Sequence, residues 1–321
     1  MKPFAYVIAQ TPESAVELAR NQGRFIAGGI DLLGELKEHL AEPKLLVNVK
    51  VLPGTQEITP AADRWVIGAN VTLAALAAHA GLRQTFPGLA EAAGEVGSPQ
   101  MRNIATVGGN LAQHSRCWYY RHRDIRCLKK GGATCYAREG ENKYHSLFSG
   151  ATCLSPVVSN LAVALTALGA SVVVQRGAKP ATLTMAQLYE SAWENPRAHH
   201  SLKPTDLILR VEIPAVAGRR STYLQMGEKS GFDWALVSCA AAARVEGGTL
   251  HDTRVVLGAV APIPWQVDEA NAWLEGKVLT DEVAAQAANL ILRDAEPLAH
   301  NAYKVPLARA LVRRALAKLV T

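Results

Sequence analysis

Short apolar runs alternate with helical patterns along the first 50 residues of the chain. Residues 4–9 form an apolar run typical of a strand, and residues 11–23 have a helical period with Thr11 at the N-cap and a proline in the first position. Residues 24–40 predict a second strand, a Gly-Gly turn and a helix with leucines on one face, and residues 44–49 predict a third strand. The pattern therefore predicts a small α/β unit.

From about residue 56 to residue 217, short strands alternate with helices, and Pro214 followed by a Gly-Arg-Arg run predicts a linker. The remaining residues predict three strands and then helices near 281–292 and 301–320. Apolar residues repeat with a helical period in the last helix and predict a core face; they are Tyr303, Leu307, Leu311, Ala315 and Leu319.

These patterns divide the chain into two domains. We expect a first domain over residues 1–217, made of a small α/β subdomain at 1–55 and a second subdomain at 56–217, and a C-terminal α+β domain over residues 218–321. A cysteine-rich segment, at about 112–154, interrupts the second subdomain.

Composition places the chain among ordinary globular proteins, because 49% of its 321 residues are hydrophobic and 19% are charged. The net charge of +6 raises the question of nucleic-acid binding. The charges are mostly dispersed, however, and no helix-turn-helix, RNP or zinc-finger spacing accompanies them. We therefore expect a solvated or partner-facing surface and no nucleic-acid partner.

The amino-terminal segment has neither the apolar stretch of a signal peptide nor paired arginines. A span without formal charge runs from Tyr144 to Gln175, but polar residues, proline and glycine interrupt it, which predicts buried soluble structure and no membrane span. Cytoplasmic residence is the default expectation. A periplasmic location is possible if a partner with a twin-arginine signal carries the folded complex out.

Two glycine pairs stand at the starts of predicted helices, in residues 27–31 and 106–111. Such turns expose backbone N–H groups that can cradle a pyrophosphate, although glycine's tolerance of positive φ explains either turn equally well. Asp31 suits a helix cap and would repel an anion. The spacing G-x-G-x-x-G is absent, so a nucleotide here would not occupy a Rossmann turn.

Four of the five cysteines are grouped; they are Cys117, Cys127, Cys135 and Cys153, with the spacing C-x9-C-x7-C-x17-C. The fifth, Cys239, lies in an apolar strand-like run, and we expect it to be a small buried hydrophobic residue. The grouped thiols could bind zinc, although the usual tight C-x2-4-C pairs are missing, or form disulfides in an oxidising compartment. They could also be chance buried thiols or ligands of a [4Fe–4S] cluster, and spacing alone does not decide.

Several segments in order resemble the FAD-binding medium subunit of the molybdenum hydroxylases, the xanthine dehydrogenase family; they are residues 25–33, 66–76, 101–111, 255–266 and 310–316. The resemblance covers nearly the whole chain. It implies an α+β fold, with a two-part FAD-binding domain of the PCMH/vanillyl-alcohol-oxidase-like type followed by a C-terminal α+β domain of the CO dehydrogenase flavoprotein type.

The resemblance also implies which residues contact FAD, through the two glycine segments and the "PVVSN" segment; they are Ala27, Gly28, Gly29, Ile30, Asp31, Leu32, Leu33, Thr106, Gly109, Asn110 and Asn160. Four positions depart from the family pattern. Ile30 replaces a usual threonine, and Asn160 replaces an aspartate. Gln225 stands where a lysine is frequent, and Lys229 lies near a frequent arginine. These departures concern the redox tuning of the flavin and the handling of a nicotinamide.

The cysteine-rich segment resembles an insertion found in a subset of the family, which includes periplasmic aldehyde oxidoreductases and 4-hydroxybenzoyl-CoA reductase. The resemblance implies a [4Fe–4S] cluster held by the four grouped cysteines, close to the flavin. Nearby cations are expected to offset the charge of the thiolates; they are Arg116, Arg121, Arg126, Lys129 and Lys130. Trp118, Tyr119 and Tyr120 are expected to keep water from the cluster.

The implied function is that of an electron-transfer subunit with FAD and a [4Fe–4S] cluster as cofactors. A molybdopterin-containing large subunit would bind the substrate, an aldehyde or an aromatic compound, and a small subunit with [2Fe–2S] clusters would pass electrons to this chain for delivery to an external acceptor. We nominate no catalytic acid, base or nucleophile. The alternatives are a zinc-stabilised binding module and a free-standing FAD oxidase.

Overall fold

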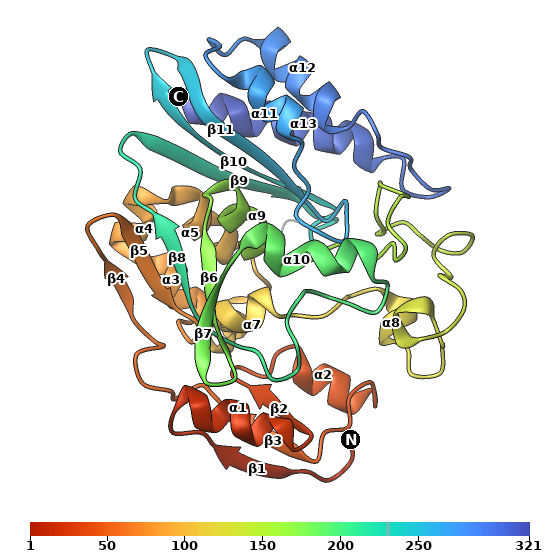
Figure 1. The fold of residues 1–321 in the computed structure, drawn as a ribbon. Helices are drawn as coiled ribbons and strands as arrows, with labels where there is room; N and C mark the ends of the chain where they lie inside the picture. Colours follow the sequence, from red (N-terminus) through yellow and green to blue (C-terminus); the bar gives the residue numbers. More distant parts are fainter. Residues whose placement is uncertain (230) are drawn as a thin grey trace.

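The computed structural model describes residues 1–229 and 231–321 and contains three β-sheets stacked along the molecule. Figure 1 shows the amino-terminal unit at one end, a five-stranded sheet with its helices in the middle, and the carboxy-terminal sheet with its helices at the other end. None of the helices within the described residues is both long and apolar enough to cross a membrane.

The amino-terminal unit has the predicted alternation of strands and helices; its elements are β1 (Ala5–Ile8), α1 (Pro12–Arg20), β2 (Gly23–Ile26), α2 (Leu32–Lys37) and β3 (Leu45–Asn48). The three strands are parallel, with β3 in the centre. Thr11 Oγ1 accepts a hydrogen bond from the Ser14 N–H, so α1 begins where the sequence predicts. In α2, Leu36 is buried but Leu33 is 39% exposed, which differs from the expected leucine face.

The middle unit contains an antiparallel sheet with the strand order β4-β5-β8-β6-β7. Its strands are β4 (Ile58–Pro60), β5 (Arg64–Gly68), β6 (Ser171–Arg176), β7 (Lys179–Thr184) and β8 (Leu207–Pro214). Its helices are α3 (Leu73–Ala78), α4 (Ala80–Thr85), α5 (Pro87–Gly94), α6 (Pro99–Ile104), α7 (Val107–Leu111), α9 (Asn160–Ala167) and α10 (Met185–Glu194). The second glycine pair lies inside α7, so the expected turn is instead a short helix capped by Thr106.

The carboxy-terminal unit is an antiparallel sheet covered by three helices. It contains β9 (Arg219–Met226), β10 (Val237–Glu246), β11 (Thr249–Gly258), α11 (Asp268–Leu274), α12 (Asp281–Ile291) and α13 (Lys304–Val320). Ala240 and Ala242 of β10 pack toward the middle unit, whereas Cys239 and Ala241 pack toward the helices. Both faces of this strand are therefore buried, which explains its uninterrupted run of small apolar residues.

Helix α13 buries a stripe that begins one residue later than the sequence predicts. Leu311, Ala315 and Leu319 are buried as expected, but the first turn buries Lys304 in place of Tyr303. The pattern missed this register because a lysine rarely enters a core without partners.

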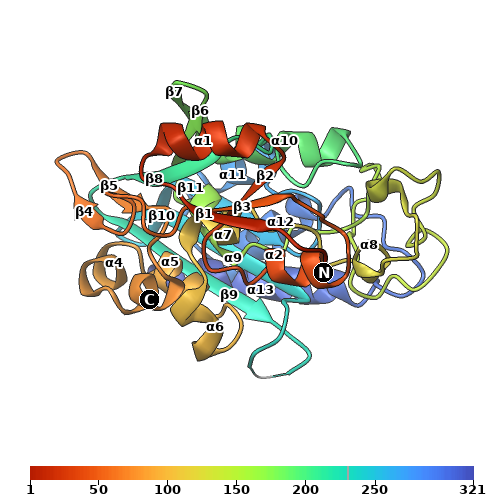
Figure 2. The same cartoon turned by 90° about the horizontal axis from the view of Figure 1, so that it is seen from below.

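The insertion, residues 112–154, has little regular structure. It contains α8 (Trp118–Arg121) and one 3-10 turn, η1 (Leu128–Lys130). Figures 1 and 2 both show it extending from one side of the molecule, near α2. Backbone hydrogen bonds in its turns and contacts made by its side chains therefore hold this segment in place.

Candidate functional site

A cavity of about 700 Å³ lies where the amino-terminal unit, the middle unit and the insertion meet. Ten of the eleven residues expected to contact FAD line it; they are Ala27, Gly28, Gly29, Ile30, Asp31, Leu32, Thr106, Gly109, Asn110 and Asn160. Leu33 is the exception. The loop at 195–204 and the aromatic residues Phe232 and Trp234 complete the wall.

The first glycine segment joins β2 to α2 on this wall. A Cβ atom on Gly28 would lie 2.2 Å from the backbone oxygen of Ile104, and Gly29 has a φ of +72°. Each position therefore requires glycine for a different reason, the first for space and the second for conformation. The N–H groups of Gly28, Gly29 and Ile30 make no hydrogen bond to any described residue, so they are available to a ligand in the cavity.

The second glycine segment forms α7, which begins next to the first segment because Gly28 packs against Ile104 and Ala105. Thr106 Oγ1 accepts a hydrogen bond from the Gly109 N–H at 3.1 Å and caps the helix. Asn110 Oδ1 accepts from the Ser159 hydroxyl at 2.6 Å, which links this segment to the start of α9. The two expected flavin segments and Asn160 therefore belong to one connected wall.

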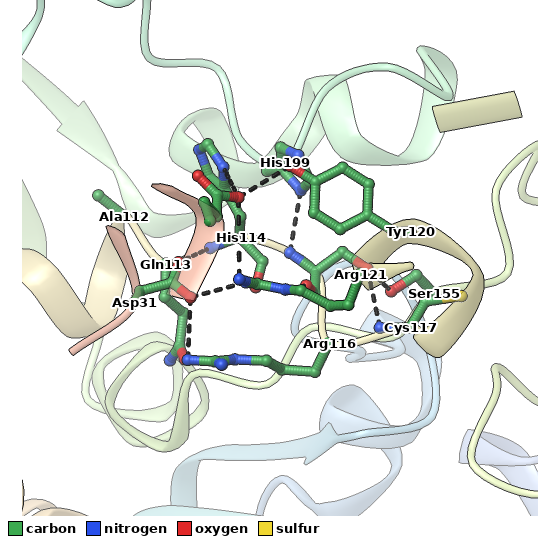
Figure 3. Close-up of polar contacts among 12 residues, drawn as sticks. Asp31, Ala112, Gln113, His114, Arg116, Cys117, Tyr120, Arg121, Ser155 and His199 are labelled. Atoms are coloured by element: carbon green, nitrogen blue, oxygen red, sulfur yellow. Dashed lines mark hydrogen bonds and ion pairs between the residues drawn. The ribbon is translucent and has the colours of Figure 1, made fainter. Parts of the chain in front are cut away.

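Asp31 does not cap α2, because its side chain makes no cap hydrogen bond there. Its carboxylate instead accepts from the His114 N–H at 2.7 Å and from Arg121 Nη2 at 2.6 Å, and it pairs with Arg116 Nη2 at 2.9 Å (Figure 3). Two arginines from the insertion thus neutralise this carboxylate. The expected repulsion of an anionic ligand is therefore offset.

Glu35, one turn further along α2, is 2% exposed and was not singled out in the sequence. Its Oε1 accepts hydrogen bonds from His114 Nδ1 and from the Tyr120 hydroxyl, each at 2.8 Å. Burial alone would raise the pKa of Glu35, but these hydrogen bonds and the charge of Arg121 outweigh burial and hold the pKa at about 2. Glu35 is therefore an anion that ties α2 to the insertion.

A histidine pair connects the cavity wall with the insertion. The rings of His114 and His199 are stacked, with centroids 4.0 Å apart and an interplanar angle of 7°. His199 Nδ1 accepts a hydrogen bond from the Ser115 N–H at 3.0 Å, and the Ser115 hydroxyl accepts from the Cys117 N–H at 3.1 Å. Burial lowers the pKa of His199 well below its usual value. Ser115 therefore connects the loop at 195–204 to Cys117 through two hydrogen bonds.

All four grouped cysteines line one small pocket inside the insertion. Cys127 and Cys153 are buried, and Cys117 and Cys135 are half-buried. Burial raises the pKa of Cys117 to about 12, so thiolates here require a compensating positive charge. Tyr119 and Tyr120 lie on the same wall, as expected, whereas Trp118 does not line the pocket and is 37% exposed.

Of the five cations expected near the thiols, Lys129 lines their pocket and is buried. Arg116 and Arg121 instead bind Asp31, Lys130 donates to backbone oxygens, and Arg126 is exposed. Within the described residues, no group of three or more His, Cys, Asp or Glu side chains is placed to hold a single metal ion. The four thiols share a pocket without converging on one point.

His145 is a further residue of the thiol pocket that the sequence analysis missed. Its Nε2 lies 3.1 Å from the Sγ atom of Cys117. No spacing rule identifies it, because 28 residues separate the two positions. Only the folding of the insertion brings them together.

Two of the residues that depart from the family pattern, Asn160 and Gln225, are hydrogen-bonded to each other. Asn160 Nδ2 donates to Gln225 Oε1 at 2.9 Å, and Gln225 Nε2 donates to Glu95 Oε2 at 3.2 Å. Asn160 and Glu95 both line the large cavity. The two amides therefore form one neutral pair beside the cavity.

Comparison with known proteins bears on this arrangement. Residues 2–216 match the family model described as the FAD binding domain in molybdopterin dehydrogenase, and residues 221–319 match the CO dehydrogenase flavoprotein C-terminal domain. The chain is 32% identical to the aldehyde oxidoreductase FAD-binding subunit PaoB of Escherichia coli K12, over 99% of this chain and 98% of that protein.

The chain is also 27% identical to the carbon monoxide dehydrogenase medium chain of Hydrogenophaga pseudoflava, over 98% of this chain and 96% of that protein. A solved structure of that carbon monoxide dehydrogenase superposes with a TM-score of 0.77 and 25% identity, covering 99% of this chain and 98% of that one. Quinoline 2-oxidoreductase from Pseudomonas putida 86 shares the fold, with a TM-score of 0.77 and 24% identity, covering 100% of this chain and 98% of that one.

The family expectation and the expected pair of domain types are thus confirmed, and relatives are named as subunits or chains of larger oxidoreductases. The chain belongs to the FAD-binding medium subunits of the molybdenum hydroxylases, the family of the CO dehydrogenase and aldehyde oxidoreductase FAD subunits.

Proposed function

We propose that this chain is an electron-transfer subunit that carries FAD in the large cavity and passes electrons between a partner's [2Fe–2S] clusters and an external acceptor. The observation that carries the proposal is the cavity of about 700 Å³, lined by both glycine segments. We assign the FAD site to the eleven residues that the resemblance implies. The ten that line the cavity would contact FAD, and Leu33 would support the site through its packing against Gly29.

The first glycine segment would hold the diphosphate of FAD. Its backbone N–H groups have no hydrogen-bond partner among the described residues and could therefore donate to phosphate oxygens. Arg116 and Arg121 cancel the charge of Asp31, so this carboxylate can remain beside a phosphate group. When bound, FAD would supply the redox chemistry, and the chain's own residues would bind and orient it.

We further propose that Cys117, Cys127, Cys135 and Cys153 hold a [4Fe–4S] cluster. Four thiols around one shared pocket support this assignment. Ligands of a single zinc ion would lie within about 4 Å of one another, because Zn–S bonds are about 2.3 Å long. A cubane spreads its thiolates over four irons, so its four ligands surround one pocket without meeting at a single point. Lys129, which lines that pocket, would offset part of the thiolate charge.

The partners we propose are a molybdopterin-containing large subunit and a small subunit with [2Fe–2S] clusters. The substrate would be an aldehyde or an aromatic compound bound on the large subunit, and the aldehyde oxidoreductase relative favours the aldehyde. We propose residues 1–217 and 218–321 as the two domains. Cytoplasmic residence stays the default, with periplasmic export on a partner's signal as the alternative.

The experiment is a cofactor analysis of the chain purified with exclusion of air. We expect yellow-brown protein that bleaches with dithionite, about one FAD released per chain, and about four iron and four sulfide per chain. The matched control is Cys239→Ser, which removes a buried thiol outside the pocket and should keep its iron, whereas Cys127→Ser should lose it.

Three results would contradict the proposal. Colourless protein with one zinc ion would favour a binding module. Protein without released FAD would reject the flavin assignment. Rapid aldehyde oxidation by the chain alone would favour a free-standing oxidase.

A further inference from the structure

His145 lies in the wall of the thiol pocket and is 2% exposed. Its Nε2 is 3.1 Å from Cys117 Sγ, within hydrogen-bond distance for a sulfur acceptor. A thiolate has no proton to donate, so a bond to it requires the proton on Nε2. The other ring nitrogen has no hydrogen-bond partner among the described residues. The sulfur is therefore the polar contact that orients this ring.

Aromatic neighbours restrict the ring further. Its centroid lies 5.6 Å from that of Trp118, in an edge contact, and 6.1 Å from that of Tyr119. Both neighbours belong to α8, which directly follows Cys117 in the chain. The helix that begins at the cysteine thus also restricts the imidazole that faces its sulfur.

The backbone of His145 is held from the carboxy-terminal domain. Lys304 Nζ donates to the backbone oxygens of Tyr144, His145 and Ala259 at 3.1, 3.0 and 2.9 Å. Asn301 Nδ2 donates to the oxygens of His145 and Ser146 at 3.2 and 2.9 Å. The Lys304 and Asn301 side chains are both fully buried. Four of these five hydrogen bonds hold residues 144–146, the segment that carries the imidazole, and the fifth ties Lys304 to Ala259.

We propose that His145 is a positioning residue that donates a hydrogen bond to the Cys117 ligand and raises the reduction potential of the cluster. The proposal rests on the [4Fe–4S] assignment made above. Hydrogen bonds to cluster sulfurs favour the reduced, more negative state and so raise the potential. Such a bond inside a buried pocket is stronger than in water, because the local dielectric is low.

The same contacts place the cluster under the influence of a second part of the molecule. The cysteines come from the insertion, whereas Asn301 and Lys304 come from the segment that begins α13. The position of the imidazole therefore depends on contacts from both parts of the molecule.

The test compares three variants in protein that contains about four iron and four sulfide per chain. His145→Phe keeps a ring of similar size and removes the donor. His145→Gln keeps an N–H donor near the position of Nε2. His122→Phe is the matched control, because His122 is exposed in the same insertion and its ring contacts no thiol in the described structure. The midpoint potential is measured by redox titration with electron paramagnetic resonance.

We expect the midpoint potential to become more negative in His145→Phe, to return toward the wild-type value in His145→Gln, and to stay unchanged in His122→Phe. An unchanged potential in His145→Phe with a full cluster would overturn the inference and leave the proposed function intact. Absence of iron and sulfide from the wild-type chain would overturn the proposed function itself. An equal shift of the midpoint potential in His145→Phe and His145→Gln would also reject the hydrogen bond as the cause.

Discussion

At the scale of single residues, the cavity wall shows how two substitutions can depend on each other. Asn160 donates to the oxygen of Gln225, and the nitrogen of Gln225 donates to Glu95. A chain of amides has a direction, because each group donates on one side and accepts on the other. Replacing one amide by a carboxylate breaks this direction even though the shape hardly changes.

We predict that Asn160→Asp lowers the free energy of unfolding by about 1–3 kcal/mol, because a buried carboxylate oxygen would face the Gln225 oxygen. The double variant Asn160→Asp/Gln225→Lys should recover part of this loss by placing a cation beside the carboxylate. Urea denaturation of the two single variants and the double variant measures the coupling.

The matched control is Asn195→Asp, the same chemical change at an exposed asparagine that acts only as an acceptor, from the Arg197 N–H. This variant should unfold at nearly the wild-type urea concentration. If the changes in unfolding free energy caused by Asn160→Asp and Gln225→Lys simply add, positions 160 and 225 are not energetically coupled and the prediction is wrong.

At the scale of elements, α2 connects the flavin loop with the insertion. Asp31 at its start contacts Arg121 (Figure 3). Glu35, further along the helix, accepts hydrogen bonds from His114 and Tyr120. The insertion has few backbone hydrogen bonds of its own in regular elements. These two anionic groups are therefore expected to contribute much of the order of this segment.

We predict that Glu35→Gln lowers the free energy of unfolding by about 3 kcal/mol, because it removes the buried anion that accepts hydrogen bonds from His114 and Tyr120. Amide hydrogen exchange of residues 114–121 should become faster. The control is Glu17→Gln, which breaks an exposed pair with Arg20 and should cost less than about 1 kcal/mol. An unchanged rate of amide hydrogen exchange in residues 114–121 would contradict the prediction that Glu35 stabilises the insertion.

The pH dependence of stability tests the same carboxylate. The pKa of Glu35 is lowered from 4.5 to about 2 in the folded chain. A lowered carboxyl pKa stabilises the fold above pH 4.5, and this contribution is lost as the pH falls from 4.5 toward 2. The urea midpoint of the wild type should therefore fall more steeply below pH 4.5 than that of Glu35→Gln.

At the scale of the whole molecule, Lys304 joins the carboxy-terminal domain to the insertion. Its ammonium group donates to Tyr144 and His145 of the insertion and to Ala259 at the end of β11. Burial lowers the pKa of Lys304 from 10.5 to about 7. Below this pH the ammonium form donates to all three oxygens although its burial opposes folding, and above it the amine keeps two N–H groups and donates to two of them.

We predict that Lys304 makes the chain more stable as the pH rises from 7 toward 10.5, because the unfolded chain then binds more protons than the folded chain. The free energy of unfolding should rise by about 1 kcal/mol per pH unit in this range. Lys304→Met should remove this slope in thermal unfolding between pH 7 and 9.

The control for Lys304→Met is Lys318→Met, since Lys318 lies on the same helix and forms an exposed pair with Glu91. Lys318→Met should keep the wild-type dependence of stability on pH. Equal slopes in the wild type and Lys304→Met would show that the lysine titrates outside this range.

Much of the fold could be predicted from local patterns. The Thr11 cap fixed the start of α1, and the apolar runs located the strands β8 to β11, because caps and apolar runs act within a few residues of sequence. The second glycine pair was assigned to a turn but lies in α7. Glycine lowers the intrinsic tendency to form a helix, and contacts with the middle unit overrode that tendency.

The sequence by itself determined the family, the two glycine segments and the four grouped cysteines, since each is a set of residue types at fixed positions. Only the tertiary structure decided which charges meet. Asp31 and Glu35 find their partners about 80 to 90 residues away, and His145 meets Cys117 across 28 residues. Pairings over such distances depend on how helices and loops pack, and no local pattern records them.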